Sequence, residues 1–161
     1  MEPQVARRKV TLERSFNAAI EEVWELWTTK EGIESWWGPE GFSVEVRRLD
    51  LRPGGELLYA MTATAPEQIE FMKKAGMPLT TESRATYIEV ARHRRLAYRQ
   101  QADFIPNVRP YDVETSVEFE AGPTGVRIVL TFDAMHDEEW TKRAVMGNES
   151  QLRRLERLLA R

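Results

Sequence analysis

One long amphipathic helix is predicted near the C-terminal end of the chain, and it limits the fold more than any other feature. Asp137 can begin it, and several arginines near its far end suit the negative pole of the helix dipole. One face is formed by residues at three- and four-residue spacing: Trp140, Ala144, Gly147, Gln151, Leu152, Leu155, Leu158 and Leu159. About 24 residues make a helix about 36 Å long, which is enough to cross a whole sheet.

Most of the preceding chain alternates apolar and polar residues, which is typical of half-buried strands. Seven strands are expected, at residues 10–16, 43–51, 56–62, 84–91, 95–102, 113–119 and 126–132. The alternation changes phase near Arg47 and Arg48, which indicates a β-bulge. The run Arg52-Pro53-Gly54-Gly55 predicts a type II turn between the second and third strands.

Three short helices interrupt the strands. The first places Ile20, Val23, Trp24 and Trp27 on one face, and Asn17 is expected to cap it. The second covers about residues 30–36. The third lies in an insertion at 66–79, between a proline start and Gly and Pro stop signals, and we hypothesise that it covers a cavity as a lid.

This order of elements predicts one α+β domain over residues 1–161. A curved seven-stranded antiparallel sheet is expected, with the helices on one side and the long helix across its face. A twisted sheet curls, and one straight helix cannot fill the whole concavity. We therefore expect an internal cavity lined by apolar side chains.

Composition excludes several classes of protein. Apolar residues make up 42% of the chain, the formal net charge is −3, and neither half has the basic excess that would follow a nucleic-acid backbone. There is no cysteine, which removes disulfides, thiolate nucleophiles and zinc–thiolate sites and is consistent with a cytoplasmic location. No signal peptide or membrane-spanning run is expected.

Nine residues are candidate ligand contacts. Tyr98, Gln100 and Thr115 are the polar residues of an inward face that is otherwise apolar. The others lie at strand ends, in the loop 103–110 or on the long helix, where a cavity would open or be covered: Met61, Phe104, Tyr111, Met135, Trp140 and Ala144. Internal hydrogen bonds and closure of an ordinary core are the alternative explanations.

No catalytic or metal site is predicted, and no cofactor. The chain has two histidines, His93 in an arginine-rich turn and His136 at the helix entry, and no nucleotide-binding or nucleophile motif appears. Glu89 and Asp112 could act as a general acid or base, but their strand positions point them to solvent. Trp36 and Trp37 are interpreted as packing between the short helices and the sheet.

Several blocks of sequence together resemble a known family. These are Trp36-Trp37-Gly38-Pro39-Glu40-Gly41-Phe42, Leu49-Asp50-Leu51-Arg52-Pro53-Gly54-Gly55, Ile88-Glu89-Val90, Arg95-Leu96-Ala97-Tyr98 and Gly147-Asn148-Glu149. They resemble the bacterial Hsp90-ATPase-activator-homologue group of the START-like, Bet v 1-like superfamily. Two features depart from that pattern: Asn148 stands where many members carry Trp, and the insertion 66–79 is longer than usual.

The resemblance implies a helix-grip fold whose cavity takes small apolar or aromatic molecules. Our first hypothesis is a binding protein for such a molecule. A second is an enzyme of the polyketide-cyclase or dehydratase kind, which requires an acid or base inside the cavity. A third is an interaction domain for a chaperone ATPase of the Hsp90 type. A homodimer is also plausible.

Overall fold

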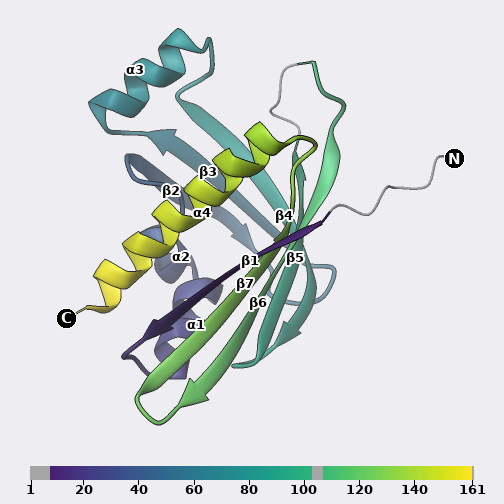
Figure 1. The fold of residues 1–161 in the computed structure, drawn as a ribbon. Helices are drawn as coiled ribbons and strands as arrows, with labels where there is room; N and C mark the ends of the chain where they lie inside the picture. The colour runs from purple at the N-terminus through teal and green to yellow at the C-terminus, as the bar shows by residue number, and fades with distance from the viewer. Residues whose placement is uncertain (1–7, 103–106, 161) are drawn as a thin grey trace, which may run out of the picture.

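The computed structural model describes residues 8–102 and 107–160 (Figure 1). Its elements follow the expected order. They are β1 (Lys9–Phe16), α1 (Ile20–Thr28), α2 (Lys30–Trp36), β2 (Phe42–Leu49), β3 (Glu56–Ala63), α3 (Pro66–Lys74), β4 (Thr80–Ala91), β5 (Arg95–Ala102), β6 (Tyr111–Gly122), β7 (Gly125–Asp133) and α4 (Glu138–Leu159). The α+β class is confirmed.

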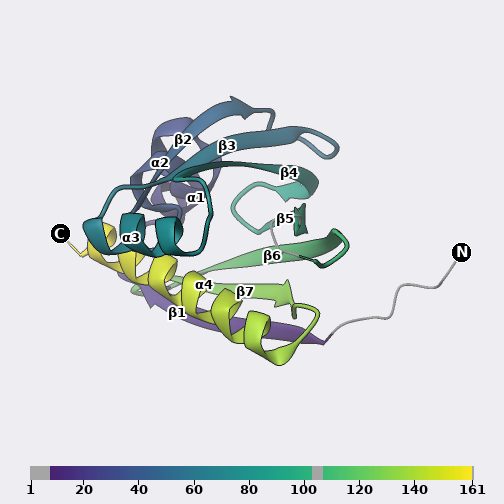
Figure 2. The same cartoon turned by 90° about the horizontal axis from the view of Figure 1, so that it is seen from above.

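The seven strands form one antiparallel sheet in the order β1-β7-β6-β5-β4-β3-β2. The predicted bulge is present, because the register of β2 on β3 shifts between Val46 and Arg48. A second shift lies between Tyr87 and Glu89 of β4. The sheet curls from β2 round to β1, and α4 runs across its open side, as Figure 2 shows.

The helices α1 and α2 carry the chain from one edge of the sheet, β1, to the other, β2. Val23, Trp24 and Trp27 of α1 are buried as predicted. The ring of Trp27 lies 4.6 Å from that of Trp36 and 6.1 Å from that of Phe119, between centroids. Edge-to-face aromatic contacts of this kind stabilise a core beyond the area they bury, and here they attach both helices to the sheet.

The expected cap of α1 is wrong. The helix begins at Ile20 after Ala19, and no side chain caps it. Residues 17 and 18 form a bend that takes the chain off the sheet edge, so Asn17 lies before the helix. Asp137 does cap α4 as predicted, since its Oδ1 accepts the N–H of Trp140 at 2.8 Å.

Several strand bounds also differ from the prediction: β6 runs from Tyr111 to Gly122 rather than over 113–119, and β4 and β2 differ at one end by two or more residues. β4 begins at Thr80 rather than residue 84, because Thr80 still pairs with Thr62 of β3. β2 ends at Leu49 rather than residue 51, where the chain enters the turn that contains Gly54. Gly54 has a φ of +84°, which the type II turn requires.

The inserted helix α3 packs on the loop between α2 and β2. Gly41 in that loop has a φ of +89°, and a Cβ there would lie 2.5 Å from Cγ of Gln68 on α3. The backbone N–H groups of Thr64 and Ala65 both donate to the Gly41 carbonyl. Within the described part of the chain, no helix is both long and apolar enough to cross a membrane.

Candidate functional site

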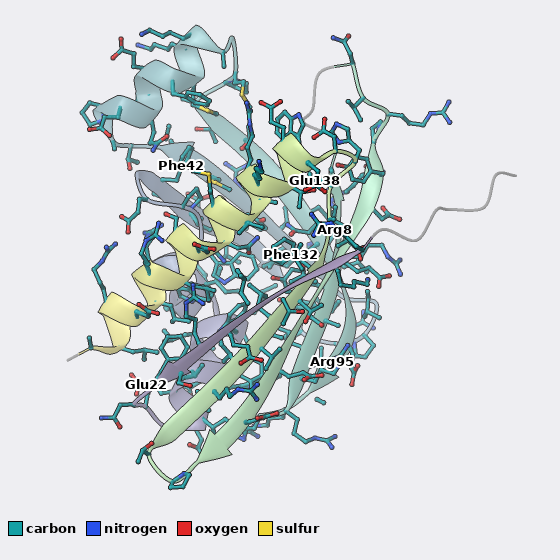
Figure 3. The ribbon with its side chains drawn as sticks, viewed as in Figure 1. Arg8, Glu22, Phe42, Arg95, Phe132 and Glu138 are labelled. Carbon is teal, nitrogen blue, oxygen red and sulfur yellow. The ribbon has the colours of Figure 1, made fainter. Side chains whose placement is uncertain are left out.

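The two halves of α4 meet the sheet differently. Leu152 and Leu155 toward its C-terminal end are 1% and 0% exposed and close the core. Nearer the middle of the helix, Ala144, Asn148 and Gln151 line an inner cavity of about 130 Å³. In Figure 3, Phe132 of β7 lies in the interior that α4 crosses. An apolar cavity of about 150 Å³ is known to bind benzene, so this space is of single-ring size.

The inner cavity has walls from the sheet, from α4 and from the residue after α2. Its lining consists of Trp37, Tyr59, Tyr98, Gln100, Val113, Thr115, Phe132, Asp133, Met135, Ala144, Asn148 and Gln151. The expected lining of apolar side chains is therefore only half right. Polar side chains of β5, β6 and α4 make up much of the wall: Tyr98, Gln100, Thr115, Asn148 and Gln151.

An outer crevice of about 560 Å³ adjoins the inner cavity. It opens where the sheet splits: β4 and β5 pair no further than Ala85 with Gln100. Beyond that point β4 continues with β3, and β5 continues with β6. The crevice and the cavity share Tyr59, Gln100, Val113, Met135 and Ala144, so the crevice is the mouth of the cavity.

A short polar network stands at the junction of the two spaces. Nε2 of Gln100 donates to the hydroxyl of Tyr59 at 2.7 Å. Burial raises the pKa of Tyr59, although hydrogen bonds from Gln100 and Ser83 oppose that change. Burial, with Tyr59 and Tyr87 nearby, also raises the pKa of Tyr98. Both phenols are therefore neutral at physiological pH.

The structure brings five of the nine candidate residues to the inner cavity. They are Tyr98, Gln100, Thr115, Met135 and Ala144. Met61 lines the outer crevice. Phe104 lies outside the described residues.

Tyr111 and Trp140 line neither space in the described part of the chain. Instead they surround the turn between β7 and α4. The Tyr111 hydroxyl lies 2.9 Å from Nδ1 of His136 and accepts the backbone N–H of His136 at 3.2 Å. The ring of Trp140 lies 6.4 Å from that of His136, and the guanidinium of Arg143 lies over the Trp140 ring, 4.7 Å from its centroid. These residues support Met135 rather than line the cavity.

Seven residues of the inner wall were not among the nine candidates: Trp37, Tyr59, Val113, Phe132, Asp133, Asn148 and Gln151. Asn148 and Gln151 lie four and seven positions after Ala144 on α4, so the helical period could have found them. Tyr59 lies two positions before the candidate Met61 on β3, so the alternation of the strand could have placed both on one face. Trp37 was interpreted as packing alone. The Trp37 side chain both packs in the core and forms part of the cavity wall. It is 4% exposed, and its ring lies beside those of Tyr59 and Tyr98.

Acidic and metal-binding groups are sparse at this site. Among residues 8–102 and 107–160, no three His, Asp or Glu side chains gather as a metal site would require. Asp133 is the carboxylate in the inner wall, but it pairs with Lys9 and accepts the N–H of Glu114 at 2.9 Å. Glu82 in the crevice pairs with Arg47 at 2.6 Å. Asp112 in the crevice also has an interaction partner.

A curved antiparallel sheet that encloses a C-terminal helix, with a cavity between them, defines a helix-grip domain of the START and Bet v 1 type. The family model for "activator of Hsp90 ATPase homolog 1-like protein" matches residues 17–160. The chain belongs to this family.

Solved structures show the same fold. A crystal structure of a protein from Chromobacterium violaceum has a TM-score of 0.77 at 21% identity, over 95% of this chain and 97% of that one. A homologue of the activator family from Silicibacter pomeroyi gives 0.69 at 24% identity, over 95% and 98%. An activator-like protein from Aeromonas hydrophila, solved by NMR, gives 0.68 at 22% identity, over 94% of each chain. No curated protein matches the sequence significantly.

Proposed function

We propose that this chain binds a small hydrophobic or aromatic molecule between the sheet and α4. The observation that carries the proposal is the inner cavity of about 130 Å³, which opens through a larger crevice and is walled by Trp37, Tyr59, Tyr98 and Phe132. Burial of apolar surface contributes about 25 cal/mol per Å². A ligand that fills the cavity and extends into the crevice can therefore bind in the micromolar range.

The lining favours binding over proton transfer. A cyclase or dehydratase would need an acid or base that is free to reach the ligand. The ionisable side chains in the described inner wall are two neutral tyrosines and Asp133, whose oxygens already bind Lys9 and the backbone of β6.

The outer face of the sheet favours the small-molecule function over docking on a protein partner by this face. It carries ion pairs that join strands. Arg47–Glu82 spans β3, and the others join neighbouring strands: Arg95–Glu89, Arg95–Glu118, Arg99–Glu114, Arg127–Glu13 and Arg127–Glu120. A contiguous apolar patch is the usual mark of a docking face. The charged side chains of these ion pairs interrupt the surface that they cover, so no such patch forms there.

Native mass spectrometry of protein purified from its own host tests the proposal. We expect a bound small molecule that survives transfer and is lost from Ala144→Phe, because the larger ring would fill the cavity. Met146→Phe is the matched control, since Met146 lies on the same helix but is 68% exposed. Equal retention of the molecule by both variants would place it elsewhere and refute the proposed site.

A further inference from the structure

A buried hydrogen-bond donor of the inner wall has no acceptor. Nε1 of Trp37 is fully buried and finds no hydrogen-bond partner among the described residues. A buried donor left in this state costs about 1–3 kcal/mol. Two other buried polar atoms share this condition, Nε1 of Trp27 and the hydroxyl of Tyr87, but neither residue lines the cavity. Trp37 is thus the residue of the cavity wall that carries an unpaired, buried donor.

Two hydroxyl groups of the same wall are also free. Tyr98 and Thr115 face each other across β5 and β6 and both line the cavity. Among the residues that the structure describes, neither side-chain oxygen has a hydrogen-bond partner. The ring of Tyr98 lies 6.0 Å from that of Trp37, between centroids. These groups therefore gather on one side of the cavity.

The amide of Gln151 adds a further donor. Its Oε1 accepts the backbone N–H of Gly38 at 3.0 Å. That bond determines the orientation of the amide, because only the oxygen can accept, and it leaves the NH₂ group available. Gln100 and Asn148 of the same wall donate through their amide nitrogens to Tyr59 and Ala144, which leaves their oxygens as acceptors. The indole of Trp37 can only donate, so its chemical complement is an acceptor atom.

The acceptor must belong to an uncharged molecule. No Lys, Arg or His occurs in the described lining of the inner cavity, and Asp133 is itself acidic. Burying an anion without a cationic partner costs far more than one hydrogen bond returns. A carboxylate or phosphate is therefore excluded as the buried group, whereas a carbonyl oxygen fits.

Building on the proposed function, we propose that the inner cavity binds one uncharged aromatic ring that carries a carbonyl oxygen, as in an aryl ketone. The indole N–H of Trp37 donates to that oxygen. The hydroxyl of Tyr98 or Thr115 donates a second hydrogen bond to the same oxygen. The ring occupies the space beside Phe132, and any larger substituent extends past Gln100 into the crevice.

A pair of matched probes tests the inference. Acetophenone and α-methylstyrene have nearly the same shape, and only the first has a carbonyl oxygen. We expect acetophenone to bind about tenfold more tightly, which corresponds to 1.4 kcal/mol and to one good hydrogen bond. Titration followed by NMR should also move the indole N–H signal of Trp37 downfield, among the signals of the five Trp residues.

Variants connect this preference to Trp37. We expect Trp37→Phe to reduce the preference for acetophenone to within about twofold. Trp27→Phe is the control, because Trp27 also has an unpaired indole but lies outside the cavity wall, and the preference should survive there. If Trp37→Phe does not fold, the NMR shift of Trp37 in the unaltered protein decides the matter, and an unmoved signal at saturation overturns the inference.

The remaining outcomes separate this inference from the proposed function. Equal affinity for the two probes would refute the carbonyl contact and leave the binding function standing. Tighter binding of benzoate than of acetophenone would refute the requirement for a neutral ligand. Failure of every single-ring probe to bind would refute the proposed function itself.

Discussion

The guanidinium of Arg154 on α4 holds the backbone of Trp37. Its Nη1 lies 3.0 Å from the carbonyl oxygen of Trp37 and 2.9 Å from that of Gly38. The same nitrogen also reaches the carbonyl oxygens of Pro39 and Phe42, at 3.4 and 3.2 Å. One charged side chain of the last helix therefore positions the aromatic wall of the cavity.

Removal of that side chain should loosen both the fold and the site. We expect Arg154→Ala to lower the free energy of unfolding by about 2 kcal/mol, since hydrogen bonds to a charged group contribute about 1.5–3 kcal/mol. Urea denaturation measures the change. Arg153→Ala is the matched control, because Arg153 is exposed at the preceding position of the helix, and it should change stability little. Similar losses in both variants would contradict this role for Arg154.

The buried tyrosines make the protein sensitive to alkali. Burial raises the pKa of Tyr59, Tyr87 and Tyr98 in the folded state. Their pKa in the unfolded chain is about 10, so deprotonation favours unfolding. The stability they contribute is complete below about pH 10 and is lost as the pH rises above it.

Tyr98→Phe should therefore weaken the fall in stability above pH 10, and Tyr87→Phe should do so independently. Denaturation at several pH values measures the slope. Absorbance at 295 nm gives a second check, because the three buried tyrosines should ionise only as the chain unfolds. Complete tyrosine ionisation in a protein that still shows folded circular dichroism would be inconsistent with this burial.

Lys30 and Glu34 of α2 together protect one edge of the sheet. β2 is one of the two edge strands, and Glu34 Oε2 accepts the N–H of Val46 at 2.8 Å while Lys30 Nζ donates to the Val46 carbonyl at 3.0 Å. Lys30 and Glu34 also bind each other at 2.7 Å. Covering a free edge in this way prevents it from pairing with another chain.

Hydrogen bonds from Lys30 and from Val46 lower the pKa of Glu34. Its contribution to stability is therefore present above the unfolded pKa, near pH 4.5, and is lost as the pH falls through the lower folded value. We expect Glu34→Gln to cost about 1 kcal/mol at pH 7 and to reduce the acid sensitivity of the melting temperature. Glu31→Gln, in the first turn of the same helix, is the control and should keep the acid slope of the unaltered protein.

Two helical glycines should respond to alanine with opposite signs. A Cβ at Gly147 of α4 meets nothing within 4 Å, whereas a Cβ at Gly32 of α2 would lie 2.4 Å from the carbonyl oxygen of Glu25. Alanine is favoured over glycine in a helix by about 1 kcal/mol. Thermal melts should show Gly147→Ala stabilised by about that amount and Gly32→Ala destabilised. If Gly147→Ala were destabilised, the added methyl group would have to meet a neighbour within 4 Å, which contradicts this structure.

The hypothesis that the inserted helix is a lid can be tested by deletion. No residue of α3 lines the cavity or the crevice in the described part of the chain. Deleting residues 67–77 leaves a short hairpin, because Ala63 and Leu79 are already joined by a hydrogen bond of 2.8 Å. We therefore expect the affinity for acetophenone to stay within about twofold. A larger loss of affinity would support the hypothesis that α3 is a lid.

Local patterns predicted the elements well because they depend on residues close in the sequence. The phase change at Arg47 and Arg48 located the bulge of β2, and Asp137 located the start of α4. Strand parity also predicted that Tyr98, Gln100 and Thr115 point inward, since alternate residues of a strand share a face. Asn17 failed as a cap because the direction of the chain at the sheet edge, which no local pattern encodes, delays the helix.

Trp36 and Trp37 show where such prediction ends. They are neighbours of the same type and are both buried. The indole of Trp36 donates to the Leu26 carbonyl at 2.7 Å, while that of Trp37 has no acceptor and lines the cavity. Their sequence positions cannot distinguish them, because the difference comes from what α1 brings beside Trp36 and what β3 and β5 bring beside Trp37.

The sequence by itself determined the seven strands, the long helix and the side of each strand that faces inward, because hydrophobic period and capping act over a few residues. Only the tertiary structure decided where α4 leaves the sheet, where β4 parts from β5 and which donors remain unpaired. Those features depend on the curvature of the whole sheet and on contacts such as that between Arg154 and Trp37, which lie 117 positions apart.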